Sequence, residues 1–169
     1  MKIRKLTITA VLSALSLGIF VLESQIPPLI PVYGVKLGLA NVVTLYTKAT
    51  LGTRAALAVL FIKIFLGNFF AGSAVSLIYS IFGGVLCFSA EILMFKLVTK
   101  KQMWAVSITG AIFHNIGQII AAIILMGTEK ILWYLTILIP VGIVTGTFTG
   151  LCATYTLKTT EKYHLGGKI

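Results

Sequence analysis

The chain has 169 residues, of which 58% are hydrophobic and only 11% are charged. Soluble domains are nearer half apolar and about a quarter charged, and a domain this small leaves much of its surface in water, so the composition excludes an ordinary soluble protein. The net charge is +10, from 14 Lys and Arg against four acidic residues, and there is no Asp. A charge this basic fits either nucleic-acid binding or a membrane protein with positive cytoplasmic loops, and the positions of the charges decide between them.

Six apolar segments predict transmembrane helices within a single domain that covers residues 1–169. A helix needs roughly 20 apolar residues to cross about 30 Å of hydrocarbon. In chain order the predicted spans are 7–22, 36–50, 54–72, 74–97, 104–126 and 131–157. Residues 23–35 contain three prolines and predict a loop, partly re-entrant because it is also apolar. We therefore expect an all-α integral membrane protein, a bundle of about six helices.

The basic residues set the orientation of this bundle. If the N-terminus is cytoplasmic, 11 of the 14 basic residues fall on the cytoplasmic side. They are Lys2, Arg4, Lys5, Lys48, Arg54, Lys96, Lys100, Lys101, Lys158, Lys162 and Lys168. Positive residues favour the cytoplasm, so both termini are predicted to be cytoplasmic in a multi-pass protein of a prokaryotic cytoplasmic membrane. The charge is then an orientation signal, and it does not indicate a nucleic-acid partner.

One lysine lies midway along the third predicted span. An ammonium group there costs at least about a few kcal/mol, and such residues usually face a bundle interior or a wet cavity. Lys63 is therefore a candidate to bind an anionic substrate. The alternative is that Lys63 reaches toward an interface with its long side chain, or that the span is shifted along the chain.

Three polar side chains lie together in the fifth predicted span. His114 and Gln118 are four residues apart and share a helix face, while Asn115 lies about 100° around the helix. This cluster predicts the polar wall of a substrate site. Hydrogen bonds between helices, which polar side chains also supply in membranes, are the alternative.

Four further residues are weaker candidates for the same site. Asn41 in the second span and Asn68 near the outer end of the third either line the cavity or bond a neighbouring helix. Glu23 and Lys36 bracket the proline-rich loop, where they pair with each other, meet a ligand or stay solvated.

Glu91 lies in the inner part of the fourth span, within reach of Lys96 or the inner loops. We expect a structural ion pair or a partner contact there, rather than a proton relay.

The chain lacks the motifs of several enzyme classes. There is no Walker-type phosphate loop and no HExxH or CxxC pattern, and Cys87 and Cys152 do not have metal-ligand spacing. Without Asp there is no aspartate-rich motif to hold magnesium and a diphosphate. We therefore expect no catalysis, no metal and no cofactor in this chain, and any active transport needs a partner that hydrolyses ATP.

Two spans carry small residues at a spacing of four. Ala10 and Ala14 form AxxxA in the first span, and Gly142, Gly146 and Gly150 form GxxxGxxxG in the sixth. Such a stripe lets another helix approach closely. The partner helix is either within the chain or in another protein.

The basic N-terminus, the segments TITAVLSALSLGIFVLE and YGVKLGLANVVTL and the proline-rich loop between them resemble the Gx transporter family. This family is also called heptaprenyl diphosphate synthase component I, and it is similar to the S components of energy-coupling factor transporters. The resemblance covers nearly the whole chain, and Val35–Leu45 is its most specific piece. It implies six helices around an outward-facing substrate site, capped by the loop between the first two helices. It also implies that Ala10 and Ala14 contact a transmembrane coupling protein, which is bound to two ATPase subunits.

Two functions follow as hypotheses. The first is a substrate-binding subunit of an energy-coupling factor transporter that takes up a small nutrient or cofactor. The second is a noncatalytic membrane subunit linked to polyprenyl diphosphate or quinone synthesis, or to flavin-dependent electron transfer.

Overall fold

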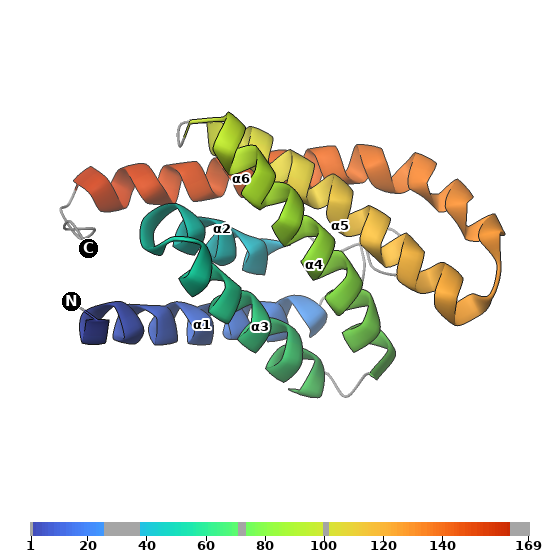
Figure 1. The fold of residues 1–169 in the computed structure, drawn as a ribbon, viewed down its shortest axis with the longest axis horizontal. Helices are drawn as coiled ribbons and strands as arrows, with labels where there is room; N and C mark the ends of the chain where they lie inside the picture. Colours follow the sequence, from blue (N-terminus) through green and yellow to red (C-terminus); the bar gives the residue numbers. More distant parts are fainter. Residues whose placement is uncertain (1, 26–37, 71–73, 100–101, 163–169) are drawn as a thin grey trace.

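The computed structural model describes residues 2–25, 38–70, 74–99 and 102–162. Over these ranges the chain forms six α-helices and one 3₁₀ helix, with no strand (Figure 1). In chain order they are α1 (Lys2–Gln25), α2 (Leu39–Leu51), α3 (Thr53–Phe70), α4 (Ala74–Leu97), α5 (Met103–Met126), the 3₁₀ helix η2 (Glu129–Tyr134) and α6 (Leu135–Lys162).

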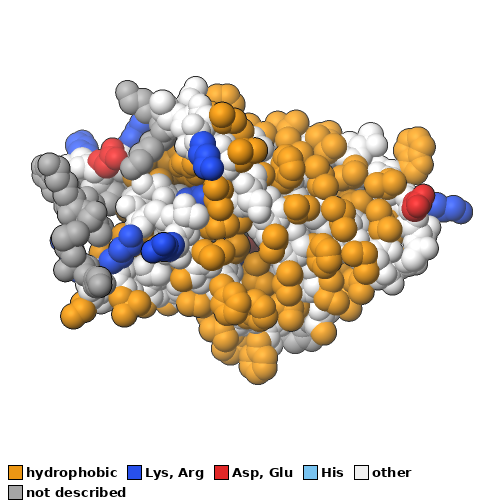
Figure 2. Space-filling model, viewed as in Figure 1, with side chains coloured by type: hydrophobic (Ala, Val, Ile, Leu, Met, Phe, Trp, Pro, Cys, Tyr) orange, Lys and Arg blue, Asp and Glu red, His pale blue; other side chains and the backbone are white. Residues whose placement is uncertain are grey.

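The surface of the bundle is that of a membrane protein. Five helical segments are long and apolar enough to cross a membrane, and α2, with 13 residues, is not among them. Large apolar side chains such as Phe69 and Val144 are mostly exposed. Figure 2 shows hydrophobic side chains across the middle of the molecule, most of the visible Lys and Arg side chains at one end and a small charged group at the other. The predicted all-α membrane bundle is thus confirmed.

Helix boundaries differ from the predicted spans mainly at turns and charged ends. Helix α4 coincides with the predicted span 74–97. Helix α1 starts at Lys2, so its basic residues belong to the helix rather than precede it. Gly38 and Gly52 flank α2 with φ angles of 75° and 89°, which glycine adopts without steric cost, and these turns keep α2 short. The sixth span begins with η2 rather than with an α-helix.

The helices pack in an order that differs from their order in the chain. Helix α1 contacts α2 and α3, α3 contacts α4, and α4, α5 and α6 pack in sequence. Helix α2 closes the arrangement because it contacts both α3 and α6. The first residues of α1 and the last of α6 lie at the same end of the molecule (Figure 1), as six helices that alternate in direction require.

The glycine stripe of α6 packs against α5. A Cβ atom added at Gly146 would lie 2.7 Å from Ile108 Cα, and one added at Gly150 would lie 2.5 Å from Trp104 Cα. These distances are too short for any residue with a side chain, so the two backbones are in direct contact. The partner helix of the GxxxGxxxG motif is therefore within the chain.

Toward the end where α1 begins, a set of buried apolar side chains packs together. We call this buried set the inner cluster. It comprises Leu45, Ala49, Met103, Val106, Ala153 and Leu157, from α2, α5 and α6.

Candidate functional site

Lys63 points into the bundle. Its side chain is only 4% exposed, and Nζ donates a hydrogen bond of 2.6 Å to Asn41 Oδ1 on α2. The ammonium group is thus held among helices rather than at a membrane surface. This acceptor is a neutral amide, which offsets less of the cost of burying a charge than a carboxylate does, and Lys63 also interacts electrostatically with Glu91 of α4.

Contacts across α4 fix the depth of Lys63. Its neighbour Ile64 packs against Gly84, where an added Cβ would lie 2.6 Å from Ile64 Cδ1. On α5, His114 packs against Gly83, where an added Cβ would lie 2.8 Å from His114 Cε1. Lys63 and His114 therefore lie at the same depth, on either side of α4.

A second level of polar groups lies one helical turn further from the end of the bundle where α1 begins. Asn68 of α3 and Ser80 of α4 approach each other, with 3.5 Å between Ser80 Oγ and Asn68 Oδ1. Gln118 of α5 follows His114 by four residues, roughly 6 Å along the helix. Asn68 is 3% and Gln118 8% exposed. We call Asn41, Lys63, Asn68, Ser80 and Gln118 the outer polar group.

Asn115 lies apart from the outer polar group. It donates a hydrogen bond of 2.7 Å from Nδ2 to the backbone oxygen of Leu138 on α6. This is the bond between helices that the sequence left as the alternative for this cluster. His114, Asn115 and Gln118 thus face three different surroundings, although they lie within five residues.

Glu23 is buried at the outer end of α1. Its Oε1 accepts a hydrogen bond from the backbone N–H of Gly38, the residue that precedes α2. The carboxylate therefore lies at a helix N-terminus, where a negative charge is favoured. Lys36, the other residue predicted beside the loop, lies outside the described residues, as does the proline-rich segment 26–37.

A buried ion pair links α2 to α4, and the sequence did not reveal it. Lys48 Nζ lies 3.1 Å from Glu91 Oε2, donates to the backbone oxygen of Phe88 at 3.2 Å and lies 4.0 Å from the centre of the Phe88 ring. Both charged side chains are almost fully buried. Lys48, which was counted among the charges on the cytoplasmic side, is therefore buried between helices. Glu91 does form an ion pair, but with Lys48 rather than Lys96.

The spacing of polar residues in α2 could have indicated this pair. Asn41, Thr44 and Lys48 recur at i, i+3 and i+7, which places them on one helix face. That face contacts Lys63 through Asn41 and Glu91 through Lys48. Because Lys48 was counted only as an orientation charge, this pattern was not used.

Ala10 and Ala14 lie on an exposed face of α1. Gly18, four residues further on, is also exposed, and an added Cβ there would meet no atom within 4 Å. The small-residue stripe of α1 is thus uncovered, unlike the glycine stripe of α6.

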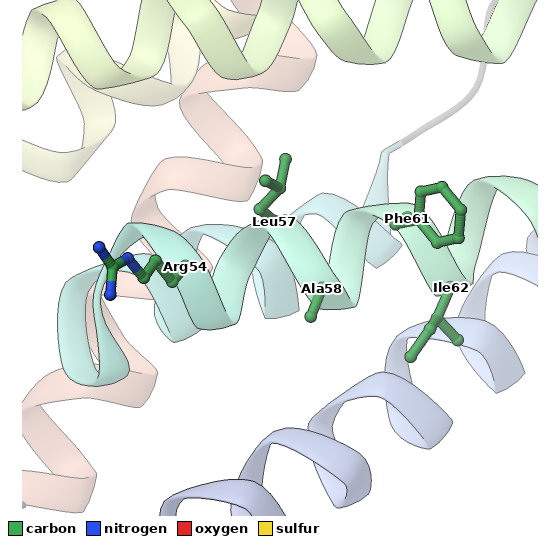
Figure 3. A pocket seen from close by; sticks show the side chains of 5 residues that line it. All are labelled: Arg54, Leu57, Ala58, Phe61 and Ile62. Atoms are coloured by element: carbon green, nitrogen blue, oxygen red, sulfur yellow. The ribbon is translucent and has the colours of Figure 1, made fainter.

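A shallow hollow follows the exposed face of α3 (Figure 3). It is lined by Arg54, Leu57, Ala58, Phe61 and Ile62. These positions lie on one side of the helix, and apart from Arg54 at one end they are apolar. The hollow lies on the surface of the bundle. It is separate from the outer polar group, whose α3 residues are buried.

The outer polar group consists of side chains that can form hydrogen bonds with a ligand. It offers one ammonium group, two Asn amides, a Gln amide and a hydroxyl group within about two helical turns. Among the described residues, no group of three or more His, Cys, Asp or Glu side chains is placed to hold a metal ion.

A family model described as heptaprenyl diphosphate synthase component I matches residues 12–156 of the chain. The match runs from α1 into α6 and includes all residues of the outer polar group. No curated protein and no solved structure matches the chain.

Proposed function

The chain belongs to the heptaprenyl diphosphate synthase component I family, and on that premise we propose that it is a noncatalytic, substrate-binding membrane subunit that works like the S component of an energy-coupling factor transporter. Its substrate is a small anionic or zwitterionic nutrient or cofactor. The protein takes it up across a prokaryotic cytoplasmic membrane.

The observation that carries this proposal is the buried Lys63. An ammonium group inside a membrane bundle is costly, and ionisable residues at such positions usually serve substrate or ion pathways. Lys63 donates a hydrogen bond to a neutral amide, and further polar groups on α3 and α4 lie about one helical turn away. We expect the anionic group of the ligand to bind beside this ammonium group.

The exposed stripe of α1 supports a partner in the membrane. Ala10 and Ala14 would allow a helix of a transmembrane coupling protein to approach closely. The coupling protein would connect this chain to ATPase subunits, which supply the energy for uptake.

Co-purification tests the partner. The wild-type protein, isolated gently from its own host, is expected to carry ATPase subunits and a small molecule in native mass spectrometry. Replacing Ala10 and Ala14 together by Leu should reduce ATPase co-purification by at least about ten-fold, because the larger side chains block close approach. Ala58→Leu, at an exposed alanine of α3, is the matched control and should leave co-purification unchanged. An unchanged complex in the α1 double variant would place the docking face elsewhere.

The family name favours a second candidate function. A protein called component I of a prenyl diphosphate synthase implies a second component, and this chain would be its noncatalytic membrane partner. In that case the same purification yields a soluble prenyl synthase subunit or a bound polyprenyl chain, and no ATPase.

A further inference from the structure

Gln118 has a buried atom that the protein leaves without a partner. Among the described residues, its Oε1 is the one buried side-chain nitrogen or oxygen with no hydrogen bond. The side chain is 92% buried, since its exposed fraction is 8%. A carboxamide oxygen only accepts hydrogen bonds, so the missing partner must be an N–H or O–H donor.

The direction of Gln118 follows from its neighbours on α5. Gly117 packs directly on the backbone of α4 at Phe82, and Asn115 bonds to α6. Residues advance about 100° each around an α-helix, so Gln118 lies between these two directions, about 100° from Gly117 and about 60° from Asn115. Its side chain therefore points between α4 and α6, toward the interior of the bundle.

Other polar groups lie at a similar depth in the bundle. Ser80 and Asn68 are at the depth of Gln118, since they lie one turn outward of Gly84 and Ile64. Lys63 is one turn deeper. Gln118 and Lys63 thus supply an acceptor and a cation, separated along the bundle by roughly 6 Å.

We propose that Gln118 is a specificity-determining residue, and that the ligand presents an N–H or O–H donor to Gln118 Oε1 and an anionic group to Lys63. The substrate class is a small acid with an amide, imide, ureido or hydroxyl group about one helical turn from its charge. Simple fatty acids, which carry no such donor, are excluded. This assignment rests on the proposed substrate-binding function and defines what that site selects.

A site that accepts a hydrogen bond from its ligand discriminates strongly. A ligand without the donor leaves the buried oxygen unpaired, so it binds much more weakly. Conversely, Gln118→Met keeps a similar volume and removes the unpaired oxygen. In the ligand-free protein this change should raise the unfolding temperature by about 2–4 °C.

The test uses the purified full-length protein in detergent and a deproteinised bacterial metabolite extract as the probe. Wild type, Gln118→Met and Gln118→Asn are equilibrated with the extract and washed, and the retained small molecules are identified by mass spectrometry. The wild type is expected to retain an acid that carries an N–H or O–H donor. Gln118→Met should retain at least about ten-fold less. Gln118→Asn, which keeps the amide on a shorter side chain, should show an intermediate loss.

Each outcome separates this assignment from the function it rests on. A wild-type protein that retains a small molecule, with equal retention by both variants, overturns the role of Gln118 and leaves the binding function standing; an ordered water on Gln118 gives this result. The role of Gln118 is also overturned if the wild type retains an acid without a donor. A lower unfolding temperature for ligand-free Gln118→Met overturns this role as well. If the wild type retains nothing, the proposed binding function fails and this assignment fails with it.

Discussion

Two lysines are buried among the residues that the structure describes, and their surroundings differ. Lys48, between α2 and α4, lies against a carboxylate, a backbone carbonyl and an aromatic ring. Lys63, between α2 and α3, donates instead to the neutral amide oxygen of Asn41. The chain itself supplies a direct counter-ion for the first, which is typical of a structural pair. The second donates to an uncharged group deep in the bundle, and ionisable residues at such positions usually serve substrate or ion pathways.

The regions around these lysines differ in the same way. Beside Lys48 lies the inner cluster, which is apolar and closely packed. Around Lys63 lies the outer polar group, in which one oxygen has no partner and one hydrogen bond is long. Substitutions near Lys48 should therefore change stability, and those near Lys63 should change binding.

The largest expected effect is on the ion pair. Glu91→Leu leaves the Lys48 ammonium buried without its carboxylate and should lower the free energy of unfolding by about 3–5 kcal/mol. Denaturant unfolding in mixed micelles, followed by circular dichroism, measures the loss.

Two control variants accompany this prediction. Glu161→Leu, at an exposed position of α6, should change the unfolding free energy by less than about 0.5 kcal/mol. The double variant Lys48→Met/Glu91→Leu should regain most of the loss, because both charges are gone. If Glu91→Leu alone is as stable as the wild type, the pair is not structural.

The next effect concerns the contact between α5 and α6. Gly146→Ala places a methyl group against the backbone of Ile108 and should cost about 1–3 kcal/mol. Gly18→Ala, at an open helical position of α1, should instead stabilise the protein by about 0.5–1 kcal/mol. The same unfolding assay compares the two, and equal effects would contradict direct backbone contact at Gly146.

Lys63→Met should separate binding from stability. Removal of the ammonium group is expected to reduce retention of an anionic ligand by at least about ten-fold, while the unfolding free energy falls by less than about 1 kcal/mol. Native mass spectrometry measures retention. Lys130→Met, at an exposed position of η2, is the matched control and should bind normally. Unchanged retention by Lys63→Met would remove this residue from the site.

The smallest effect is expected at Asn115. Asn115→Leu removes the hydrogen bond to Leu138 and should cost about 0.6 kcal/mol, the average for such bonds in membranes. Ligand retention should stay at the wild-type level in the native mass spectrometry assay. A loss of retention with normal stability would mean that Asn115 contacts the ligand.

The sequence predicted those features that depend on local composition. Hydropathy located the helices, because a run of roughly 20 apolar residues is the length that a helix needs to cross a membrane. The mid-span position of Lys63 indicated burial for the same reason. Contacts between helices were harder to predict. Asn115 and Gln118 are both amides in the same span, and they differ only in which helix faces them. Lys48 was missed because its partner Glu91 lies 43 residues away, and only packing brings the two together.

The close glycine contacts divide the molecule into two parts. At Gly117, Gly146 and Gly150 the helices α4, α5 and α6 touch through their backbones, so they are expected to move as one stiff block. Helices α1, α2 and α3 form the other part. Lys63 belongs to the second part and Gln118 to the block. A ligand that binds both residues would link the two parts. Its binding and release would then be coupled to the strength of the association between these two groups of helices.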